Sequence, residues 1–291
     1  MSSTRSKQWE SFFQDNQSAW NARVDVHAQS RFYDVDGFRA GKSSLTKLEE
    51  RLLGDVSGQS LLHLQCHFGL DTISWARKGA RAVGVDFSSK AIALARRLTE
   101  ELSLSDSVRF VECNVYDTRA HLQETFDIVY ASFGVIGWLP DLRPWAQVIR
   151  ESLAPGGRFV LVEFHPYVWM SQIGPDLDIR YPYFNRGPIT EMGSGTYAER
   201  SANITYREHG WNHSLSDVIS ALLGAGLQID QLAEYDYSPF DNFPTLVRKD
   251  ATVGNDAASA SQTPNLDDGF WFRDYPGMVP LTLSLTASRR I

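Results

Sequence analysis

The feature that most constrains the fold is a pair of apolar segments joined by a turn and a helix-forming stretch. Residues 61–64 predict a buried strand, Gly69 predicts a tight turn, and a helix is expected to begin at Asp71 or Thr72. Residues 83–85 predict a second buried strand. A strand, a helix and another apolar strand in this order are typical of a βαβ unit, so the two strands are expected to lie parallel in one sheet.

The same alternation continues along the chain. Ser88 is the expected N-cap of a helix, Pro155 and the following glycines end another, and Ser214 with Asp217 forms a capping box. Such repeated βα units predict an α/β fold with a doubly wound parallel sheet that binds ligands at the carboxyl ends of its strands. Strands are expected over residues 60–64, 81–85, 108–111, 126–131, 158–163, 226–234 and 279–287, and helices over 71–78, from 89, 141–153 and 215–224.

Three further segments differ from this pattern. Residues 1–45 are polar with aromatic side chains at helical spacing, and two interpretations stay open: packing on the domain, or a cap over a ligand. Residues 166–212 are rich in aromatic side chains and are expected to be an inserted antiparallel segment. Residues 250–268 are small and polar without periodicity, which predicts a flexible loop. The expected division is an N-terminal helical cap, 1–45, and one domain over 46–291.

Composition narrows the possible partners and the location. The chain has 291 residues, a net charge of −7 and no run of Lys or Arg, which argues against a nucleic-acid substrate. It has no signal core and no apolar run of about 18 residues, so we expect no membrane span. Cys66 and Cys113 follow strands that a third strand would separate, so a disulfide is not expected. These features together favour a cytoplasmic protein.

An acidic residue follows the second strand in a position suited to a nucleoside. Asp86 lies about 20 residues beyond the first strand, the spacing at which a carboxylate meets a ribose in nucleotide-binding α/β units. With the Gly69 turn, this stretch resembles motifs I and II of class I S-adenosylmethionine-dependent methyltransferases. The family turn reads acid-x-Gly-x-Gly-x-Gly, whereas this chain has His63-x-Gln65-x-His67-x-Gly69. The missing glycines count more against NAD, whose pyrophosphate needs bare backbone, than against S-adenosylmethionine.

The resemblance implies a seven-stranded, mostly parallel sheet whose last strand is antiparallel beside the fifth, and S-adenosylmethionine as the cofactor. Asp86 would accept hydrogen bonds from the ribose, Phe87 would lie beside the adenine, and Asn114 with the next backbone N–H would bind the adenine edge. The cofactor-binding residues implied in this way are Gln65, His67, Gly69, Asp86, Phe87, Asn114, Val115, Ala131, Ser132 and Phe133.

No metal is expected at the site. His63, Cys66 and His67 superficially resemble a metal-binding cluster, but strand alternation and a tight turn would scatter their side chains. Residues 126–132 do not end in an aspartate suited to Mg²⁺, nor in the Asp/Asn-Pro-Pro-aromatic run of enzymes that methylate nucleobase or glutamine amino groups. The sequence therefore favours metal-independent transfer to a small molecule.

His165, at the end of the strand over 158–163, is the strongest candidate for a general base. The alternative is a structural histidine that holds the loop before Pro166, and His213 and His27 are weaker candidates for the base. The residues expected to line the acceptor site or the lid are Tyr33, Trp138 and Trp169.

These observations predict a methyltransferase that acts on a small-molecule acceptor, with no nucleic-acid or membrane partner. Two alternatives stay open: a protein that binds S-adenosylmethionine without turnover, and an NAD(P)-dependent oxidoreductase. The sequence does not identify the acceptor, the atom that would be methylated or the oligomeric state.

Overall fold

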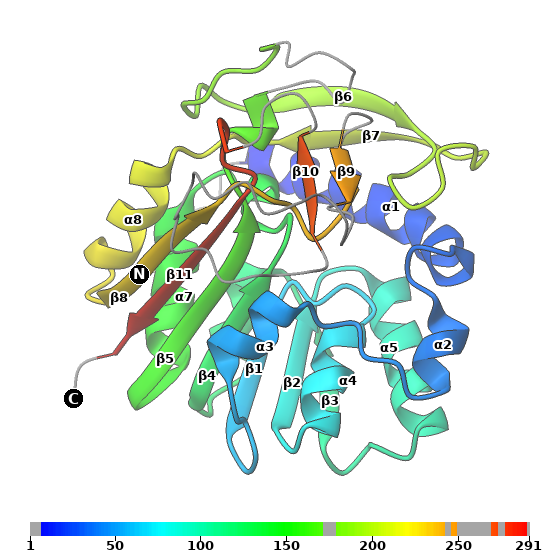
Figure 1. Cartoon of the computed structure of the whole chain (residues 1–291), viewed down its shortest axis with the longest axis vertical. Helices are drawn as coiled ribbons and strands as arrows, with labels where there is room; N and C mark the ends of the chain where they lie inside the picture. Colours follow the sequence, from blue (N-terminus) through cyan, green and yellow to red (C-terminus); the bar gives the residue numbers. More distant parts are fainter. Residues whose placement is uncertain (1–6, 171–178, 242–245, 249–268, 273–276, 290–291) are drawn as a thin grey trace, which may run out of the picture.

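The structure is a computed structural model, and it describes residues 7–170, 179–241, 246–248, 269–272 and 277–289. Its centre is a seven-stranded sheet with the strand order β3-β2-β1-β4-β5-β11-β8 (Figure 1). The first five strands along the chain pair in parallel, and β11 is antiparallel to both β5 and β8. The strands are β1 (Ser60–Leu64), β2 (Arg81–Asp86), β3 (Val108–Glu112), β4 (Phe126–Ser132), β5 (Leu153–Phe164), β8 (Gln228–Tyr235) and β11 (Thr282–Ser288).

Helices cover both faces of this sheet, and the alternating side chains of the strands divide the core in two. One face packs against α3 (Lys47–Leu53), α4 (Leu70–Arg77) and α5 (Ser89–Glu101). The other face packs against α7 (Leu142–Ser152) and α8 (Leu215–Gly224), with α6 (Thr118–His121) nearby. This is the doubly wound α/β arrangement that the sequence predicted, and the antiparallel strand beside β5 is confirmed.

Most of the expected elements are confirmed to within a residue or two, and one strand is longer than expected. The sequence predicted a strand over 158–163, but β5 begins at Leu153 and passes through Pro155 and the two glycines. It continues because Leu153 pairs with Phe126 and because the N–H of Gly156 donates to the carbonyl of Arg289. Backbone partners on both sides therefore outweigh the local turn signal.

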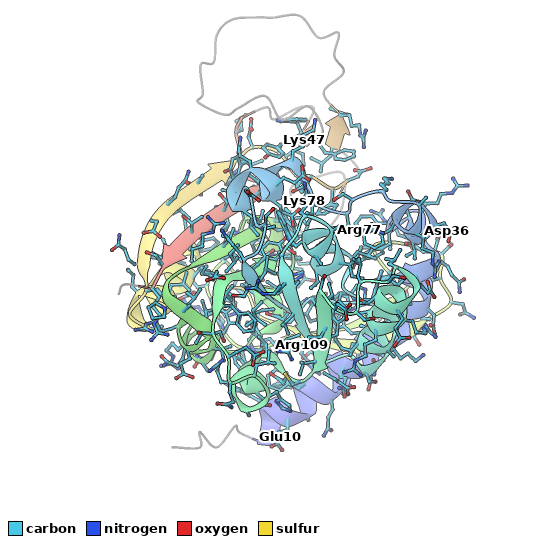
Figure 2. The ribbon with its side chains drawn as sticks, turned by 90° about the horizontal axis from the view of Figure 1, so that it is seen from below. Glu10, Asp36, Lys47, Arg77, Lys78 and Arg109 are labelled. Atoms are coloured by element: carbon cyan, nitrogen blue, oxygen red, sulfur yellow. The ribbon has the colours of Figure 1, made fainter. Side chains whose placement is uncertain are left out.

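The first 45 residues contain α1 (Lys7–Gln29) and α2 (Val35–Arg39). Helix α2 is fixed on α4, because the guanidinium of Arg77 donates to the carbonyl of Phe38 at 2.9 Å. Figure 2 views the molecule from the amino ends of the parallel strands and labels Asp36 of α2, with Arg77 and Lys78 at the end of α4. The division into an N-terminal helical cap, 1–45, and one domain over 46–291 stays a prediction.

Helix α1 and an inserted hairpin lie across the carboxyl ends of the parallel strands, at the top of Figure 1. The hairpin consists of β6 (Ile189–Ser194) and β7 (Thr205–Gly210), which pair antiparallel inside the segment that the sequence identified as an insertion. A second small pair, β9 (Leu246–Arg248) and β10 (Phe270–Phe272), was not expected. The loop expected over 250–268 lies outside the described residues. None of the helices in the described part of the chain combines the length and hydropathy that a membrane span requires.

Candidate active site

The turn after β1 has the left-handed backbone angles that favour glycine, although two of the three positions are not glycine. Gln65 and His67 have φ angles of 57° and 52°, and Gly69 follows with 77°. A left-handed conformation costs a non-glycine residue about 1–2 kcal/mol, so two residues here store strain. At Gly69 a Cβ would lie 2.4 Å from the ring of Phe110, which explains why a glycine remains at this third position.

The carboxylate of Asp86 accepts hydrogen bonds from two backbone N–H groups, one of which belongs to this turn. Its Oδ2 accepts from the N–H of His67 at 2.9 Å, and its Oδ1 accepts from the N–H of Ser88 at 2.8 Å. Burial raises the pKa of Asp86 to about 6, and the backbone hydrogen bonds from Ser88, His67 and Phe87 oppose that rise. Each carboxylate oxygen keeps a second lone pair, so the group can accept two further hydrogen bonds.

A pocket of about 170 Å³ lies between α1 and the carboxyl ends of β2 and β3. The sequence predicted that Phe87 and Asn114 would lie together, and both line this pocket. The side-chain oxygen of Asn114 accepts from the N–H of Tyr116, which fixes the orientation of the amide. The remaining lining residues are Phe13, Gln14, Gln17, Glu112 and Cys113.

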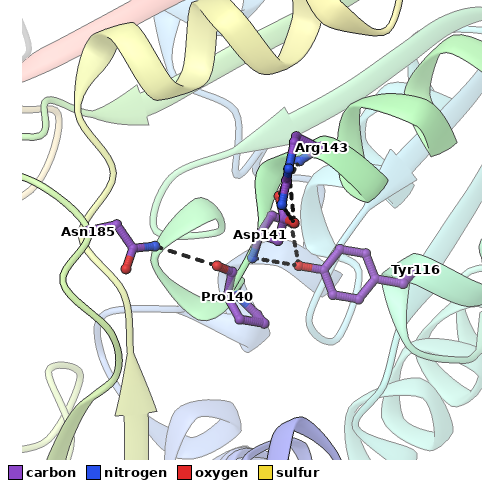
Figure 3. Close-up of polar contacts among 5 residues, drawn as sticks. All are labelled: Tyr116, Pro140, Asp141, Arg143 and Asn185. Atoms are coloured by element: carbon purple, nitrogen blue, oxygen red, sulfur yellow. Dashed lines mark hydrogen bonds and ion pairs between the residues drawn. The ribbon is translucent and has the colours of Figure 1, made fainter. Parts of the chain in front are cut away.

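Tyr116 joins this pocket to the loop before α7 (Figure 3). Its hydroxyl donates to the carbonyl of Asp141 at 2.6 Å, and Asp141 forms an ion pair with Arg143. On the insertion side, the Asn185 amide donates to the carbonyl of Pro140 at 3.4 Å. The turn after β3, the loop before α7 and the insertion are thus hydrogen-bonded into one frame.

The end of β4 is organised by a buried carboxylate that the sequence did not single out. Glu163 is fully buried and accepts from the backbone N–H groups of Gly134, Val135, Ile136 and Phe164. These four donors stabilise the charge, although burial still raises the pKa of the carboxyl. Glu163 therefore fixes the course of the loop that follows β4.

The three residues implied at the end of β4 have different surroundings. Ala131 is completely buried in the core on the side of α7 and α8, and the side chain of Val115 lies in the same core. The hydroxyl of Ser132 lies 3.5 Å from His63 Nε2. The ring of Phe133 packs against Phe164, with ring centroids 5.3 Å apart. Ala131 and Val115 can thus contribute only backbone groups to a ligand.

Helix α1 closes over the turn after β1. Gln17 donates to the carbonyl of Phe87 at 2.6 Å, and the ring of Trp20 packs edge-on against His67 at 5.1 Å and against Trp138 at 5.3 Å. His27 Nδ1 lies 2.9 Å from His67 Nε2. Gln17, Trp20 and His27 recur at helical spacing on one face of α1, a signal in the sequence that did not reveal what the face contacts.

Helix α1 is also bound to the inserted hairpin. The Asn16 amide donates to the carbonyl of His209 at 2.9 Å and accepts from its N–H at 2.8 Å. The Arg23 guanidinium pairs with Glu208 and lies 4.0 Å from the centroid of the Tyr206 ring. Arg23 is 4% exposed, and no sequence pattern pointed to it. The helix therefore connects the insertion to the sheet.

Aromatic side chains from separate segments surround this region. Tyr33 packs against the rings of His27 and Phe68, and its hydroxyl is hydrogen-bonded to that of Tyr197 in the insertion. On the β5 side, Phe164 packs against Phe133, Phe240 and Trp169. The residues expected to line the acceptor site therefore divide, with Tyr33 and Trp138 near His67, and Trp169 at the end of β5.

His165 lies where the sequence placed it, but both of its ring nitrogens are bonded. Nε2 lies 2.7 Å from Glu234 of β8, and Nδ1 accepts from the N–H of Tyr167 at 3.1 Å. Burial lowers the pKa of His165, and the Glu234 carboxylate opposes this. The geometry favours the structural alternative, and its role as a base stays a prediction. The weaker candidate His213 bonds Leu139 through Nε2.

The side chains that superficially resembled a metal cluster point to different partners. His63 Nδ1 lies 2.9 Å from the Thr72 hydroxyl, whereas the thiol of Cys66 faces the carbonyl of His67. Within the described ranges, no three His, Cys, Asp or Glu side chains form a group that could hold a metal ion.

Comparison with known proteins identifies a methyltransferase domain within part of the chain. Residues 62–159 match the model of a methyltransferase domain. A demethylmenaquinone methyltransferase from Clavibacter sepedonicus is 32% identical over 128 residues, 44% of this chain and 50% of that protein. A ubiquinone biosynthesis O-methyltransferase from Cronobacter sakazakii is 27% identical over 133 residues, 44% of this chain and 53% of that protein. The chain thus spans about half the length of these relatives.

A solved structure supports the fold over a longer stretch. An S-adenosylmethionine-dependent methyltransferase from Mesorhizobium loti superimposes with a TM-score of 0.55 at 19% identity, covering 86% of this chain and all of that one. The sheet order agrees with this fold, and residues 62–159 of the chain carry a methyltransferase domain.

Proposed function

We propose that this chain binds S-adenosylmethionine and transfers its methyl group to a small-molecule acceptor without a metal ion. The observation that carries the proposal is Asp86, a buried carboxylate that orders the turn after β1 and directly precedes Phe87, which lines the pocket. Its two remaining lone pairs can accept hydrogen bonds from a ligand. That arrangement suits a ribose with two adjacent hydroxyls.

The residues present fit the cofactor. Asp86 would hold the ribose, Phe87 and Asn114 would contact the adenine in the lined pocket, and Gln65 and His67 would meet the amino-acid part. The buried Gln65 Oε1 and His67 Nδ1 are polar atoms without a hydrogen-bond partner in the described residues, as expected of groups that await a ligand. S-adenosylmethionine supplies a methyl group on a positive sulfur; the acceptor's lone pair forms the new bond while the S–C electron pair stays on sulfur.

We further propose an acceptor with an aromatic ring. The rings of Phe133, Phe164 and Phe240 lie within 6.0 Å of one another and offer faces and edges for stacking on a planar molecule. Two relatives named for menaquinone and ubiquinone biosynthesis agree with this class of acceptor. The site between the end of β5 and the insertion would exclude water that competes with the acceptor.

The same features support the proposals on partners and location. The net charge of −7 gives no basis for attracting a nucleic acid, and small molecules are the proposed partners. Cys66 and Cys113 are buried, unpaired and separated by β2, which supports a reducing, cytoplasmic location.

A titration followed by a turnover assay tests the proposal. Calorimetry with S-adenosylmethionine, S-adenosylhomocysteine and NAD should show binding of the first two only. Mass spectrometry should then detect a gain of one methyl group on a dihydroxybenzoate or a naphthohydroquinone. Binding without turnover across a set of O–H, N–H and C–H acceptors would instead identify a protein that only senses the cofactor, and binding of NAD alone would refute the proposal.

A further inference from the structure

Two histidines from distant parts of the chain share a hydrogen bond under α1. His27 Nδ1 lies 2.9 Å from His67 Nε2, and the rings meet nearly at right angles. His27 is completely buried, and His67 belongs to the turn whose N–H groups meet Asp86. One of the two facing nitrogens must carry the proton, and the other must accept it.

The outer nitrogens of this pair distinguish it from the other buried histidines. His27 Nε2 and His67 Nδ1 are buried and have no hydrogen-bond partner among the residues that the structure describes. By contrast, both ring nitrogens of His63, His165 and His209 have partners. A buried polar atom without a partner is uncommon in a folded protein and is a candidate site for a ligand.

The surroundings favour the neutral form of both rings. Burial, followed by the charge of Arg23, lowers the pKa of His27 to about 3. Burial, followed by His27 and Arg23, lowers the pKa of His67. Each neutral ring carries one N–H and one lone pair. The position of a single proton in each ring therefore determines which outer nitrogen donates and which accepts.

We propose that His27 Nε2 accepts the proton of the methyl acceptor, and that His67 is a positioning residue that holds His27 in the required tautomer. In this arrangement, which rests on the proposed function, the Nδ1–H of His67 donates to the carboxylate of the cofactor's amino-acid part. His67 Nε2 then has only a lone pair, so it accepts from Nδ1–H of His27 and leaves a lone pair on His27 Nε2.

One proton moves from the methyl acceptor to His27 during the methyl transfer. As the acceptor's oxygen or nitrogen gains the methyl group, its proton moves to His27 Nε2, and the electron pair of the broken O–H or N–H bond stays on the heteroatom. The resulting imidazolium lies beside the aromatic rings of Tyr33 and Trp20 and near the charge of Arg23. Because that charge disfavours the imidazolium, its proton passes readily to water when the products leave. Binding of the carboxylate thereby prepares the base at a distance, through two imidazole rings.

Tautomers can be observed directly without turnover. In protein labelled with ¹⁵N-histidine, two-bond ¹H–¹⁵N spectra with S-adenosylhomocysteine should show both rings as Nδ1–H tautomers. 5′-Methylthioadenosine, which lacks the amino-acid part, should bind without fixing them. An Nε2–H tautomer of His27 in the S-adenosylhomocysteine complex, or identical tautomers with both ligands, would overturn the inference. Binding of neither ligand would overturn the proposed function and this inference with it.

Substitutions separate a base from a merely structural contact. His27→Asn keeps an amide near the Nδ1 position and removes Nε2, so turnover of an O–H acceptor should fall about 100-fold, while affinity for S-adenosylhomocysteine changes by less than about threefold. His67→Gln retains a carbonyl oxygen that can accept from Nδ1–H of His27, so this variant should preserve the His27 tautomer. His67→Leu offers no acceptor, so the His27 tautomer should no longer be fixed in it. Asn21→Ala is the matched control, because Asn21 fixes α1 to Ser88 without a titratable ring. Full turnover in His27→Asn would refute the role of the base.

Discussion

Replacing Asp86 tests the nucleoside site most directly. The carboxylate accepts two backbone N–H groups, and hydrogen bonds to a charged group are stronger than those between neutral groups. Loss of the two bonds that we assign to the ribose should cost about 2–4 kcal/mol of binding free energy in Asp86→Ala, or roughly 30- to 1,000-fold in affinity. Stability should also fall, because the N–H groups of His67 and Ser88 lose their acceptor.

The raised pKa of Asp86 adds a pH dependence with a definite sign. Since burial holds the pKa at about 6, the carboxyl of the free protein is mostly protonated at pH 5 and mostly ionised at pH 7. A carboxylate accepts ribose hydroxyls better than a carboxylic acid does, so affinity should rise roughly tenfold between pH 5 and pH 7. Asp86→Asn should remove this rise.

Calorimetry with S-adenosylhomocysteine measures both effects, and urea unfolding reports whether the variants remain folded. Asp127→Ala provides the matched control. Asp127 also accepts a backbone N–H, from Ser60 at 2.8 Å, but it lies at the opposite end of the sheet. Its loss should leave the affinity unchanged. An Asp86→Ala protein that is folded and binds S-adenosylhomocysteine as tightly as the wild type would refute the assignment of the ribose.

Three further perturbations have clear expected outcomes. In Glu163→Gln, the amide NH₂ would face backbone N–H donors, so the free energy of unfolding measured in urea should fall by about 2–4 kcal/mol. An unchanged urea midpoint would contradict the role of Glu163 in the loop after β4. His165→Gln should lower the melting temperature and leave cofactor affinity unchanged, whereas a 100-fold loss of turnover in a folded protein would favour the alternative role of His165 as a base. Activity should survive EDTA; loss that is reversed by a divalent ion would show that a metal takes part.

Local sequence signals predicted the sheet and its helices well. The apolar runs of β1 and β2 and the capping serines of α5 and α8 act within a few residues, so their elements could be identified without knowledge of the partners. The turn after β1 also kept its course despite Gln65 and His67, because surrounding contacts enforce φ values that these residues rarely adopt.

Features that depend on distant partners were not predictable. Asn16 meets His209 across 193 residues, and the pairing of His27 with His67 depends on where α1 crosses the sheet. Nothing in the sequence near Glu163 indicates that its carboxylate caps a loop about 30 residues earlier. Helical spacing revealed that α1 has a distinctive face, but only tertiary packing determines which turn that face contacts.

The attachment of α1 to two separate segments, the turn after β1 and the insertion, has a consequence for the order of kinetic events. The helix touches the cofactor turn through His27 and the insertion through Asn16, so one element completes both ligand sites. We expect that exchange of the cofactor requires α1 to move away, and that this movement also opens the proposed acceptor site. We therefore expect a sequential ordered mechanism: the methyl donor enters first, the demethylated nucleoside leaves last, and it inhibits competitively with respect to the donor and non-competitively with respect to the acceptor.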